Sequence, residues 1–315
     1  MPADVSVEPR RLPFDALLQN AAALGPIPVA VVHPCDALSL QGALQAARAG
    51  LIEPILVGPQ AKIRRAADLA ALDISASRIE DVPHSHAAAA RAVGLVRSGI
   101  AVALLKGALH TDELMAEVVD RERGLRTERR ASHVFALDVP TYPKLLLLTD
   151  GALNISPGLL DKRDIVQNAI ELADAVGIAV PQVAILSAVE TVNPRIGSTI
   201  DAAALCKMRD RGQITGALLE GPLAFDNAVS VAAAAAKGID SPVAGHADIL
   251  VVPDLMTGNM LAKQMIYLAG ASAAGIVLGT RAPIALTSRA DSVHSRVVSC
   301  ALARLLVKRQ LSLPT

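Results

Sequence analysis

The chain of 315 residues has no tryptophan, two tyrosines and three phenylalanines, so large aromatic rings are nearly missing. It also has no excess of charge of either sign, because 30 lysines and arginines balance 30 aspartates and glutamates. A neutral chain has no overall field that attracts nucleic acid or an anionic membrane. We therefore expect neither as a partner, and any anion site must be local. An adenine ring in such a site is not expected to stack on a large aromatic side chain.

Cysteine is scarce and scattered. Cys35, Cys206 and Cys300 form no C-x-x-C pair, which argues against a disulfide framework and a zinc site and fits a reducing compartment. The stretch from Met1 to Phe14 contains arginines but no apolar run behind them, so it does not read as a secretory signal. We expect a cytoplasmic protein.

Long hydrophobic runs are absent as well. The uncharged run from Gln264 to Thr280 is broken by Gly270, Gly275 and Gly279 and is short for a membrane span. It predicts a helix that leads into a buried strand. Apolar residues make up 52% of the chain and charged residues 19%, which excludes a disordered protein. At this length the chain is long for one hydrophobic core, so two lobes are expected.

The motifs of several common enzyme classes are missing. No two glycines stand two residues apart, so the dinucleotide-binding pattern G-x-G-x-x-G does not occur. Glycine pairs with P-loop spacing exist, but none is followed by lysine. The esterase pattern G-x-S-x-G and the zinc protease pattern H-E-x-x-H are absent too. The sequence therefore indicates a less generic site.

What the chain does contain is a regular alternation of short apolar runs and amphipathic stretches of helix length. Asp161 to Val176 is one such stretch, with its apolar residues on a single stripe. Nearly continuous apolar strands are typical of parallel sheets that helices cover on both faces. The pattern predicts an α/β fold with mostly parallel sheets. The expected strands are Val29–Val32, Ile55–Val57, Ala101–Leu105, Val134–Leu137, Leu145–Leu148, Val183–Leu186, Ala217–Leu219, Ile249–Val252, Gly275–Leu278 and Ile284–Leu286.

Many of these expected strands end in polar or glycine-rich residues. Ligands of open α/β sheets bind outside the carboxyl ends of the strands, where such loops gather. We expect the chemistry at that edge of the sheet. The endings are Lys106-Gly107, Thr149-Asp150-Gly151, Glu220-Gly221-Pro222, Pro253-Asp254 and Ser288-Arg289.

A series of short motifs keeps its order and spacing over the C-terminal third of the chain. These motifs are Ser241–Gly245, Ala247–Asp254, Gly258-Asn259, Leu268–Gly270, Gly275–Gly279 and Pro283–Arg289. Further motifs stand upstream: Val31–Asp36, Gly50–Gly58, Lys106-Gly107 with Thr111, Ser132-His133, Leu186–Thr191 and Gly221–Asn227. In this series the chain resembles the phosphate acetyl/butyryltransferase family over essentially its whole length. It is most similar to butyryl-type members and to the phosphate acetyltransferase half of bifunctional enoyl-CoA hydratase/phosphate acetyltransferases.

The resemblance implies a fold and an activity. The fold is a two-lobed α/β/α structure similar to isocitrate and isopropylmalate dehydrogenases, with the active site in the interlobe cleft. Residues 1–141 plus 289–315 are expected to form the first lobe and residues 142–288 an inserted second lobe. The implied reaction is reversible transfer of an acyl group, acetyl to butyryl, between coenzyme A and inorganic phosphate. It requires no metal and no permanently bound cofactor, and a homodimer or higher homo-oligomer is expected.

Acyl transfer between a thioester and phosphate needs an anion site, a group that stabilises the oxyanion, and a base for the thiol proton in the reverse direction. The resemblance assigns Ser288 to the reacting carbonyl and Arg289 to the phosphate. The predicted position, between a strand and the N-terminus of the last helix, also favours anions. The alternative is that Ser288 only caps that helix, expected over Asp291–Val307.

The base is left open by the sequence. Acetyl-type members carry an aspartate seven residues after the serine, and that position is Ser295 here. Asp291 is the nearest carboxylate and His294 the nearest imidazole, and either can accept a proton. Asp291 has a competing interpretation as a helix N-cap.

The run from Asp120 to Arg130 concentrates five arginines in an otherwise neutral chain. A solvated helix end explains such a run by default. The alternative is a clamp for phosphate or for the phosphates of coenzyme A, because guanidinium binds phosphate in a bidentate fork. Arg126 and Arg130, followed by Ser132 and His133, best match the pattern of the family.

The remaining expected substrate-binding residues stand where helices follow strands. Capping of the next helix competes with ligand binding for most of them. His84 and His86 have no third ligand nearby, so a metal site there is not expected. The expected residues are Lys106, His110, Thr111, Ser187, Asp254, Gly258 and Asn259.

Two other functions compete with acyl transfer. Dehydrogenases of similar fold bind NAD(P) and a divalent metal, but the expected strand ends offer Asp226 and Asp254 without an aspartate pair at helical spacing. A non-catalytic module that senses coenzyme A is the second alternative, and the presence of Ser288, Arg289 and Asp291 argues against it.

Overall fold

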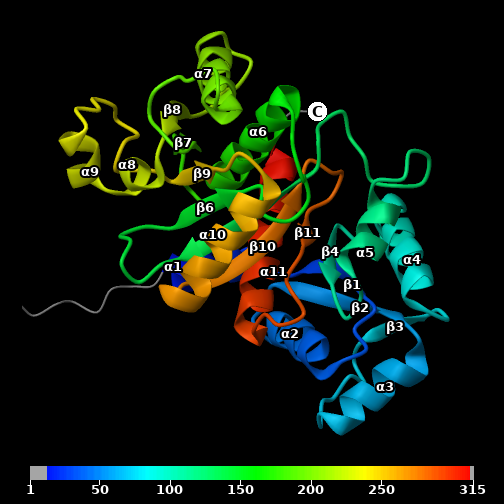
Figure 1. The fold of residues 1–315 in the computed structure, drawn as a ribbon. Coiled ribbons are helices and arrows are strands. Elements are labelled where there is room, and N and C mark those ends of the chain that lie inside the picture. Colours follow the sequence, from blue (N-terminus) through cyan, green and yellow to red (C-terminus); the bar gives the residue numbers. More distant parts are fainter. Residues whose placement is uncertain (1–12, 313–315) are drawn as a thin grey trace, which may run out of the picture.

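The computed structural model describes residues 13–312, which form one mixed sheet flanked by helices (Figure 1). The N-terminal segment interpreted above as lacking a secretory signal lies almost wholly outside these residues, as do the outermost residues of the predicted first lobe. The strands are β1 Ile27–Val32, β2 Ile52–Gly58, β3 Arg78–Asp81, β4 Ala103–Lys106, β5 Ser132–Asp138, β6 Leu146–Thr149, β7 Gln182–Leu186, β8 Leu218–Leu223, β9 Ile249–Val251, β10 Ser272–Leu278 and β11 Ile284–Ala285. The helices are α1 Pro13–Ala22, α2 Ala37–Arg48, α3 Gln60–Leu69, α4 Ser85–Arg97, α5 Thr111–Val118, α6 Leu159–Ala175, α7 Gly197–Asp210, α8 Phe225–Val229, α9 Val231–Ala236, α10 Leu255–Leu268 and α11 Val293–Ser312.

Each strand expected from the sequence is present, and the predicted α/β class is confirmed. One strand was missed. Arg78–Asp81 pairs with β2 at the edge of the sheet, where none of its residues is buried, so its sequence shows no apolar run. The helix expected over Asp161–Val176 is α6, and the uncharged run from Gln264 to Thr280 is the end of α10 followed by β10.

The sheet has the strand order β3-β2-β1-β4-β11-β10-β5-β6-β9-β7-β8. β10 is antiparallel to both β11 and β5, and β5 is antiparallel to β6, whereas every other pair is parallel. The carboxyl ends of β1, β4 and β11 therefore point opposite to those of β6, β9 and β7. The expectation of a single edge at which all strand ends meet is wrong, because two antiparallel strands separate the parallel groups.

The ends of β4 and β6 nevertheless come to the same level of the sheet. Leu105 pairs with Ala285, Ala285 with Ile276, Ile276 with Val134, and Val134 with Thr149. This single row of paired residues joins the last residue but one of β4 to the last residue of β6. Polar residues that follow the two strands, in opposite directions, therefore flank the middle of the sheet.

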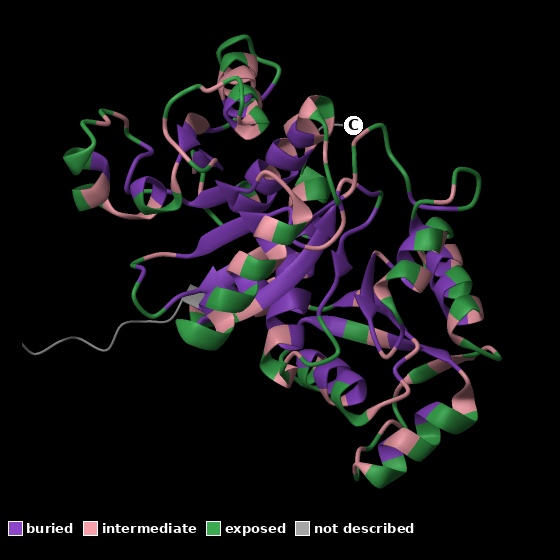
Figure 2. Ribbon diagram, viewed as in Figure 1, coloured by how far each residue is buried: buried purple, intermediate pink, exposed green. Residues whose placement is uncertain are grey.

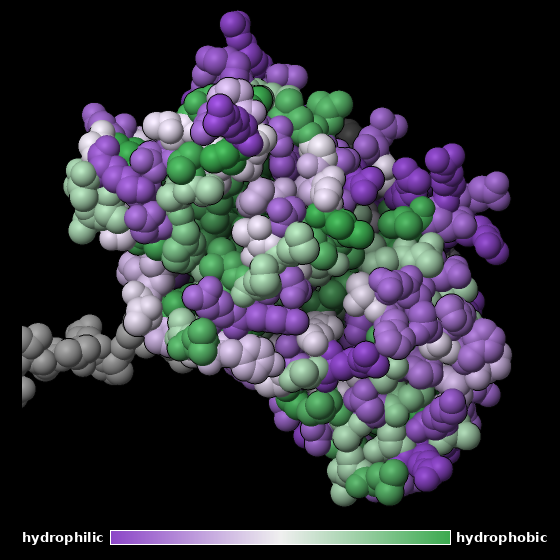
Figure 3. All heavy atoms as spheres, in the orientation of Figure 1, coloured by the Kyte–Doolittle hydropathy of each residue, from purple (hydrophilic) through white to green (hydrophobic). Residues whose placement is uncertain are grey.

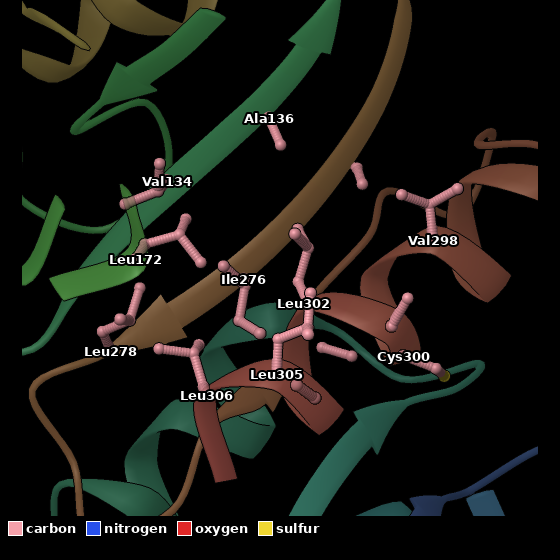
Figure 4. Close-up of a cluster of buried hydrophobic side chains, with 14 of the residues drawn as sticks. Val134, Ala136, Leu172, Ile276, Leu278, Val298, Cys300, Leu302, Leu305 and Leu306 are labelled. Atoms are coloured by element: carbon pink, nitrogen blue, oxygen red, sulfur yellow. The ribbon is translucent and has the colours of Figure 1, made fainter. Parts of the chain in front are cut away.

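The two faces of the sheet are covered differently. On one face the helix α11 packs its apolar residues against β5 and β10, in a cluster that includes Val134, Ile276, Val298 and Leu302 (Figure 4). On the other face two separate clusters form, one under α4 and α5 and the other under α8 and α10. The strands themselves are buried throughout most of the sheet (Figure 2).

The last helix begins later and ends later than the sequence predicted. It runs from Val293 to Ser312 instead of Asp291–Val307, and the hydroxyl of Ser292 accepts a hydrogen bond from the backbone N–H of Ser295 in its first turn. Residues 286–292 therefore form a loop between β11 and the helix.

Backbone hydrogen bonding is continuous across the sheet from β3 to β8, and the lobe boundaries expected at residues 141/142 and 288/289 stay a prediction. Within residues 13–312, no helix has the length and apolar character needed to cross a membrane.

Candidate active site

The candidate site lies between the two clusters, on the face of the sheet opposite α11. Its floor is β5, where His133 and Phe135 project from the same face and pack edge to face with ring centroids 4.5 Å apart. The neighbouring residue on β10 is Gly275, where any side chain would collide with the His133 imidazole and the carbonyl of Leu286. In Figure 1 the orange loop around β11 runs past this region between α10 and α5.

Lys106 ends β4 and is only 3% exposed. Its ammonium lies 3.4 Å from each of two backbone carbonyls, those of Gly107 and Thr287. Burial, with smaller contributions from the guanidinium groups of Arg296 and Arg289, lowers the pKa of Lys106 to about 8. The carboxylates of Asp291 and Asp36 act weakly in the opposite direction. The hydrogen bonds of the buried ammonium go to backbone carbonyls, so an anion bound there would stabilise it.

The loop after β11 presents Ser288 and Arg289 to solvent directly beside the buried Thr287. The Asp291 carboxylate accepts a hydrogen bond of 2.6 Å from the backbone N–H of Ser288, and the backbone N–H of Asp291 donates to the Ser288 carbonyl at 3.2 Å. These two bonds close a turn around Ser288 and Arg289. The alternative in which Ser288 or Asp291 caps the last helix is wrong, because that helix begins at Val293.

The two candidate bases have different surroundings. Asp291 is bonded to the backbone of Ser288 within the turn. The ring of His294 lies 6.2 Å from that of Phe14 in α1, and its side chain is exposed. Of the two, Asp291 is the group that the structure bonds to the Ser288 turn.

His133 is 1% exposed and has one hydrogen-bonding neighbour, the Leu286 carbonyl at 3.4 Å from Nε2, while Nδ1 has no partner. Burial lowers its pKa against the opposing effect of the Asp150 carboxylate, which favours a neutral imidazole. Ser132 is fully buried, and its hydroxyl accepts a hydrogen bond from the Asn168 amide. His133 thus reaches the loop that carries Ser288, whereas Ser132 faces away into a structural contact.

A carboxylate that the sequence analysis did not select lies next to this floor. Asp150, which is 3% exposed, accepts bonds from the backbone N–H groups of Ala152 and Leu153 and from the side chain of Asn154. The Asn154 carbonyl oxygen in turn accepts a 2.7 Å bond from Nε of Arg130. In the sequence, Asp150 is recognisable only as part of the polar ending Thr149-Asp150-Gly151 after β6, and this ending alone does not identify a site residue.

The arginine run that was expected to clamp phosphate lies on the surface of the molecule, where Arg126 and Arg130 are exposed. α5 ends at Val118, so the run from Asp120 to Arg130 follows the helix in a loop and the interpretation as a helix end is wrong. Arg126, Arg129 and Arg130 line one pocket of about 320 Å³ together with Leu153 and Asn154, among others.

The three arginines of this pocket differ in pairing. Arg129 is paired with Glu171, and the exposed Arg130 side chain lies 3.8 Å from Asp161. Arg126 is exposed, and its backbone forms an isolated bridge to Thr280. The contacts of Arg130 to Asn154 and Asp161 are both made through Nε, so its terminal nitrogens, like the exposed side chain of Arg126, remain candidates to bind a phosphate.

The other expected residues make hydrogen bonds within the protein, and their binding of substrate stays a prediction. Asp254 is the N-cap of α10 and accepts from the backbone N–H of Thr257 at 2.8 Å, so the capping interpretation is confirmed for it. Asn259 donates to the Gly151 carbonyl and holds the loop after β6, while Gly258 is buried in α10. Ser187 shares a hydrogen bond with Ser198.

At the start of α5, His110 is the N-cap residue, so Thr111 is the first helical residue and not the cap. Glu113 accepts the backbone N–H of His110. His84 is likewise the N-cap of α4. Among residues 13–312, no group of three His, Cys, Asp or Glu side chains is arranged to hold a metal ion.

Two sequence comparisons agree with each other. A family model described as phosphate acetyl/butaryl transferase matches residues 83–304. The phosphate acetyltransferase of Rhizobium meliloti is 61% identical over 297 residues, which cover 94% of this chain and 94% of that protein. The phosphate butyryltransferase of Clostridium beijerinckii is 42% identical over 296 residues, covering 94% of this chain and 98% of that protein.

Solved structures share the fold. A branched-chain phosphotransacylase from Enterococcus faecalis V583 superposes with a TM-score of 0.78 at 32% identity, covering 89% of this chain and 99% of that chain. The 4-hydroxythreonine-4-phosphate dehydrogenase of Klebsiella pneumoniae superposes with a TM-score of 0.53 at 14% identity, over 89% of this chain and 99% of that chain. The latter likeness concerns the fold alone, and it confirms that the fold is dehydrogenase-like.

Proposed function

Because the chain belongs to the phosphate acetyl/butyryltransferase family, we propose that it moves acetyl to butyryl groups reversibly between coenzyme A and inorganic phosphate at a centre formed by Lys106, Ser288 and Arg289. The chain is a phosphate acyltransferase, and coenzyme A is its substrate. The dehydrogenase and sensing-module alternatives are not favoured by these relatives. The observation that carries the assignment of the centre is the buried Lys106 ammonium beside the loop of Ser288, whose hydrogen bonds go to backbone carbonyls.

In the forward direction a phosphate oxygen attacks the thioester carbonyl, the carbon–sulfur bond breaks and the thiolate of coenzyme A leaves. Lys106 and Arg289 hold the phosphate by charge, and the Ser288 hydroxyl stabilises the oxyanion. In the reverse direction Asp291 takes the proton of the thiol, whose ordinary pKa of about 8.5 leaves little thiolate at neutral pH. The sulfur then attacks the acyl phosphate and phosphate leaves.

The function is tested by following thiol release from acetyl-, propionyl-, butyryl- and octanoyl-CoA with and without phosphate. Release should require phosphate, should favour the three short chains and should persist in EDTA. Thiol release that is equally fast without phosphate would make the protein a thioesterase instead. Loss of activity in EDTA that magnesium restores would overturn the metal-free reaction.

The charge of Lys106 predicts a pH dependence. Its pKa of about 8 means that the ammonium is present below that pH and lost above it. We therefore expect kcat/KM for phosphate to fall as the pH rises through about 8. The forward direction is measured, because the thiol is a product there and not a reactant whose own ionisation would affect the rate.

The matched variant is Lys106→Met, an unbranched apolar side chain that is one heavy atom shorter. It should lower kcat/KM for phosphate by about tenfold or more at neutral pH, as loss of a charged hydrogen bond implies, and should remove the alkaline step. An alkaline step of the same size in Lys106→Met would assign it to another group.

The arginine pocket gives a separate prediction. Arg126→Ala or Arg130→Ala should raise the KM for phosphate or coenzyme A by about tenfold, because each removes a charge-assisted contact. Arg123→Ala is the control, since that exposed arginine belongs to the same run but does not line the pocket. Unchanged constants in both pocket variants would return the run to a solvated surface.

We also propose a cytoplasmic location and a homo-oligomer. The free thiols of Cys35, Cys206 and Cys300 support the first, which cell fractionation tests. The second is supported by the apolar side of α10, where the side chains of Met256, Met260, Tyr267 and Leu268 are all more than half exposed.

This side of α10 borders a groove of about 430 Å³ that α8 also lines. Figure 3 shows hydrophobic patches in this region, interrupted by hydrophilic side chains. We expect a second copy of the chain to cover it. Light scattering should give a multimer for the parent and a monomer for Met260→Glu combined with Tyr267→Glu. Leu69→Glu, at an isolated exposed leucine of α3, should stay multimeric. A monomeric parent would overturn the proposal.

A further inference from the structure

The largest fully buried side chain in the described part of the molecule is a cation, Arg296 in the first turn of α11. It is 1% exposed. Its Nη1 donates to the Thr287 hydroxyl at 3.0 Å and lies 3.5 Å from the Lys106 carbonyl, and its Nη2 donates to the Ser288 carbonyl at 3.1 Å. One guanidinium therefore joins the end of β4 to the loop that follows β11.

Packing alone does not explain a guanidinium at this place. Burial lowers the pKa of Arg296, with Asp36 and Asp291 acting against that effect from nearby, and Nε has no hydrogen-bond partner. A buried charge without a bonded carboxylate is costly, and an apolar side chain of similar volume would fill the space at less cost. What the guanidinium adds is the planar fork that fixes several acceptors at once.

The neighbouring helix α2 carries a glycine where it passes the side chain of Arg296, and this glycine leaves space for the arginine. α2 passes over the side chain at Gly42, where a Cβ would lie 2.7 Å from Cδ and 2.9 Å from Cβ of Arg296. The two helices thus confine the stem of the arginine, and the fork at its end can take few orientations. Neither Arg296 nor Gly42 faces the loop surface on which Ser288 and Arg289 are exposed.

We propose that Arg296 is a positioning residue for acyl transfer, which sets the Lys106 ammonium and the Ser288 turn at a fixed separation. It acts through the two backbone carbonyls and the Thr287 hydroxyl and does not touch the substrates. This inference rests on the proposed function, because the separation of Lys106 and Ser288 matters for turnover only if both groups act in the same reaction.

Replacing Arg296 tests the inference, because a positioning residue should affect kcat much more than the KM for acyl-CoA. Arg296→Lys keeps the charge but loses the fork, so kcat should fall about a hundredfold, as expected for a displacement near 1 Å, while the KM for acyl-CoA changes little. Arg296→Ala should lose at least as much and should regain part of its kcat when guanidinium ion is added at millimolar concentration, below levels that unfold the protein. Ammonium ion at the same concentration should not restore it.

A second variant disturbs the arginine without replacing it. Gly42→Ala pushes against the stem of Arg296 and should lower kcat about tenfold, with the KM for acyl-CoA again nearly unchanged. Gly94→Ala in α4 is the matched control, because a Cβ there meets no atom within 4 Å. Thermal unfolding of all variants shows whether each is folded.

The outcomes separate the inference from the proposed function. If the parent chain does not transfer acyl groups between coenzyme A and phosphate, the proposed function is wrong. If the parent is active and folded Arg296→Lys and Gly42→Ala turn over like it, Arg296 has only a packing role. If Arg296→Lys and Arg296→Ala do not fold, Gly42→Ala decides, and a kcat equal to that of Gly94→Ala overturns the inference.

Discussion

Ser288→Ala should lower kcat about a hundredfold and leave the KM for acyl-CoA nearly unchanged. The hydroxyl accepts one long hydrogen bond of 3.4 Å from the backbone N–H of Ala290. The backbone of the turn is also held by Asp291 and Arg296, so the loop should keep its shape when the hydroxyl is removed. A hydrogen bond made to the oxyanion only in the transition state lowers turnover and spares ground-state binding, and loss of one such donor typically costs a hundredfold or more. Steady-state kinetics with acetyl-CoA and phosphate measures both constants.

Arg289→Ala should lower kcat to a similar extent, because it removes the exposed guanidinium beside the same hydroxyl. The control is Ser292→Ala, four residues after Ser288, which removes the cap at the start of α11. That variant should lose about 1 kcal/mol of stability without losing turnover. If Ser288→Ala and Arg289→Ala both turn over like the parent, the loop is not the reaction centre.

Asp291→Asn should lower kcat in the reverse direction by on the order of a hundredfold or more, the usual contribution of a general base. Asparagine keeps an oxygen that can accept the backbone N–H of Ser288, so the turn is preserved and only the basicity is lost. The pH–rate profile of the variant should lack the limb that belongs to the base.

His294→Gln should leave kcat within about twofold, because the ring lies against Phe14 and not in the Ser288 turn. The two variants form a matched pair, since both replace a candidate base by an amide of similar size. A loss in His294→Gln with parental kinetics in Asp291→Asn would exchange the two assignments.

Much of the fold followed from local patterns. Buried parallel strands such as Val29–Val32 read as short apolar runs, and amphipathic α6 showed a single apolar stripe. β3 was missed because an edge strand that buries none of its residues lacks that signal. The start of α11 was misplaced because Asp291 is a good capping residue in a sequence, and only the bond to Ser288 shows that it closes a turn instead.

The candidate site, like the fold, could be predicted in part. The ending Ser288-Arg289 and the arginine run are chemically distinctive in the sequence, so both could be predicted as binding or catalytic residues. Capping by Asp254 was predicted as an alternative to ligand binding. Asp150 was visible in the sequence only as part of a polar strand ending, and Arg296 was not visible at all, because a single arginine in an apolar stretch has no local mark. The role of Arg296 rests on contacts with residues far along the chain, such as Lys106, which lies 190 positions away.

The sequence by itself determined the α/β class, the positions of all strands but β3 and the family, since periodicity and short motifs are local properties. The tertiary structure alone decided which strand ends lie at the same level. β10 and β5 reverse the strand direction in the middle of the sheet, so β4 and β6 end from opposite directions in one row, on either side of β11, β10 and β5. Strand direction is set by long-range hydrogen-bond pairing, and a buried guanidinium finds its acceptors only when those strands are in register.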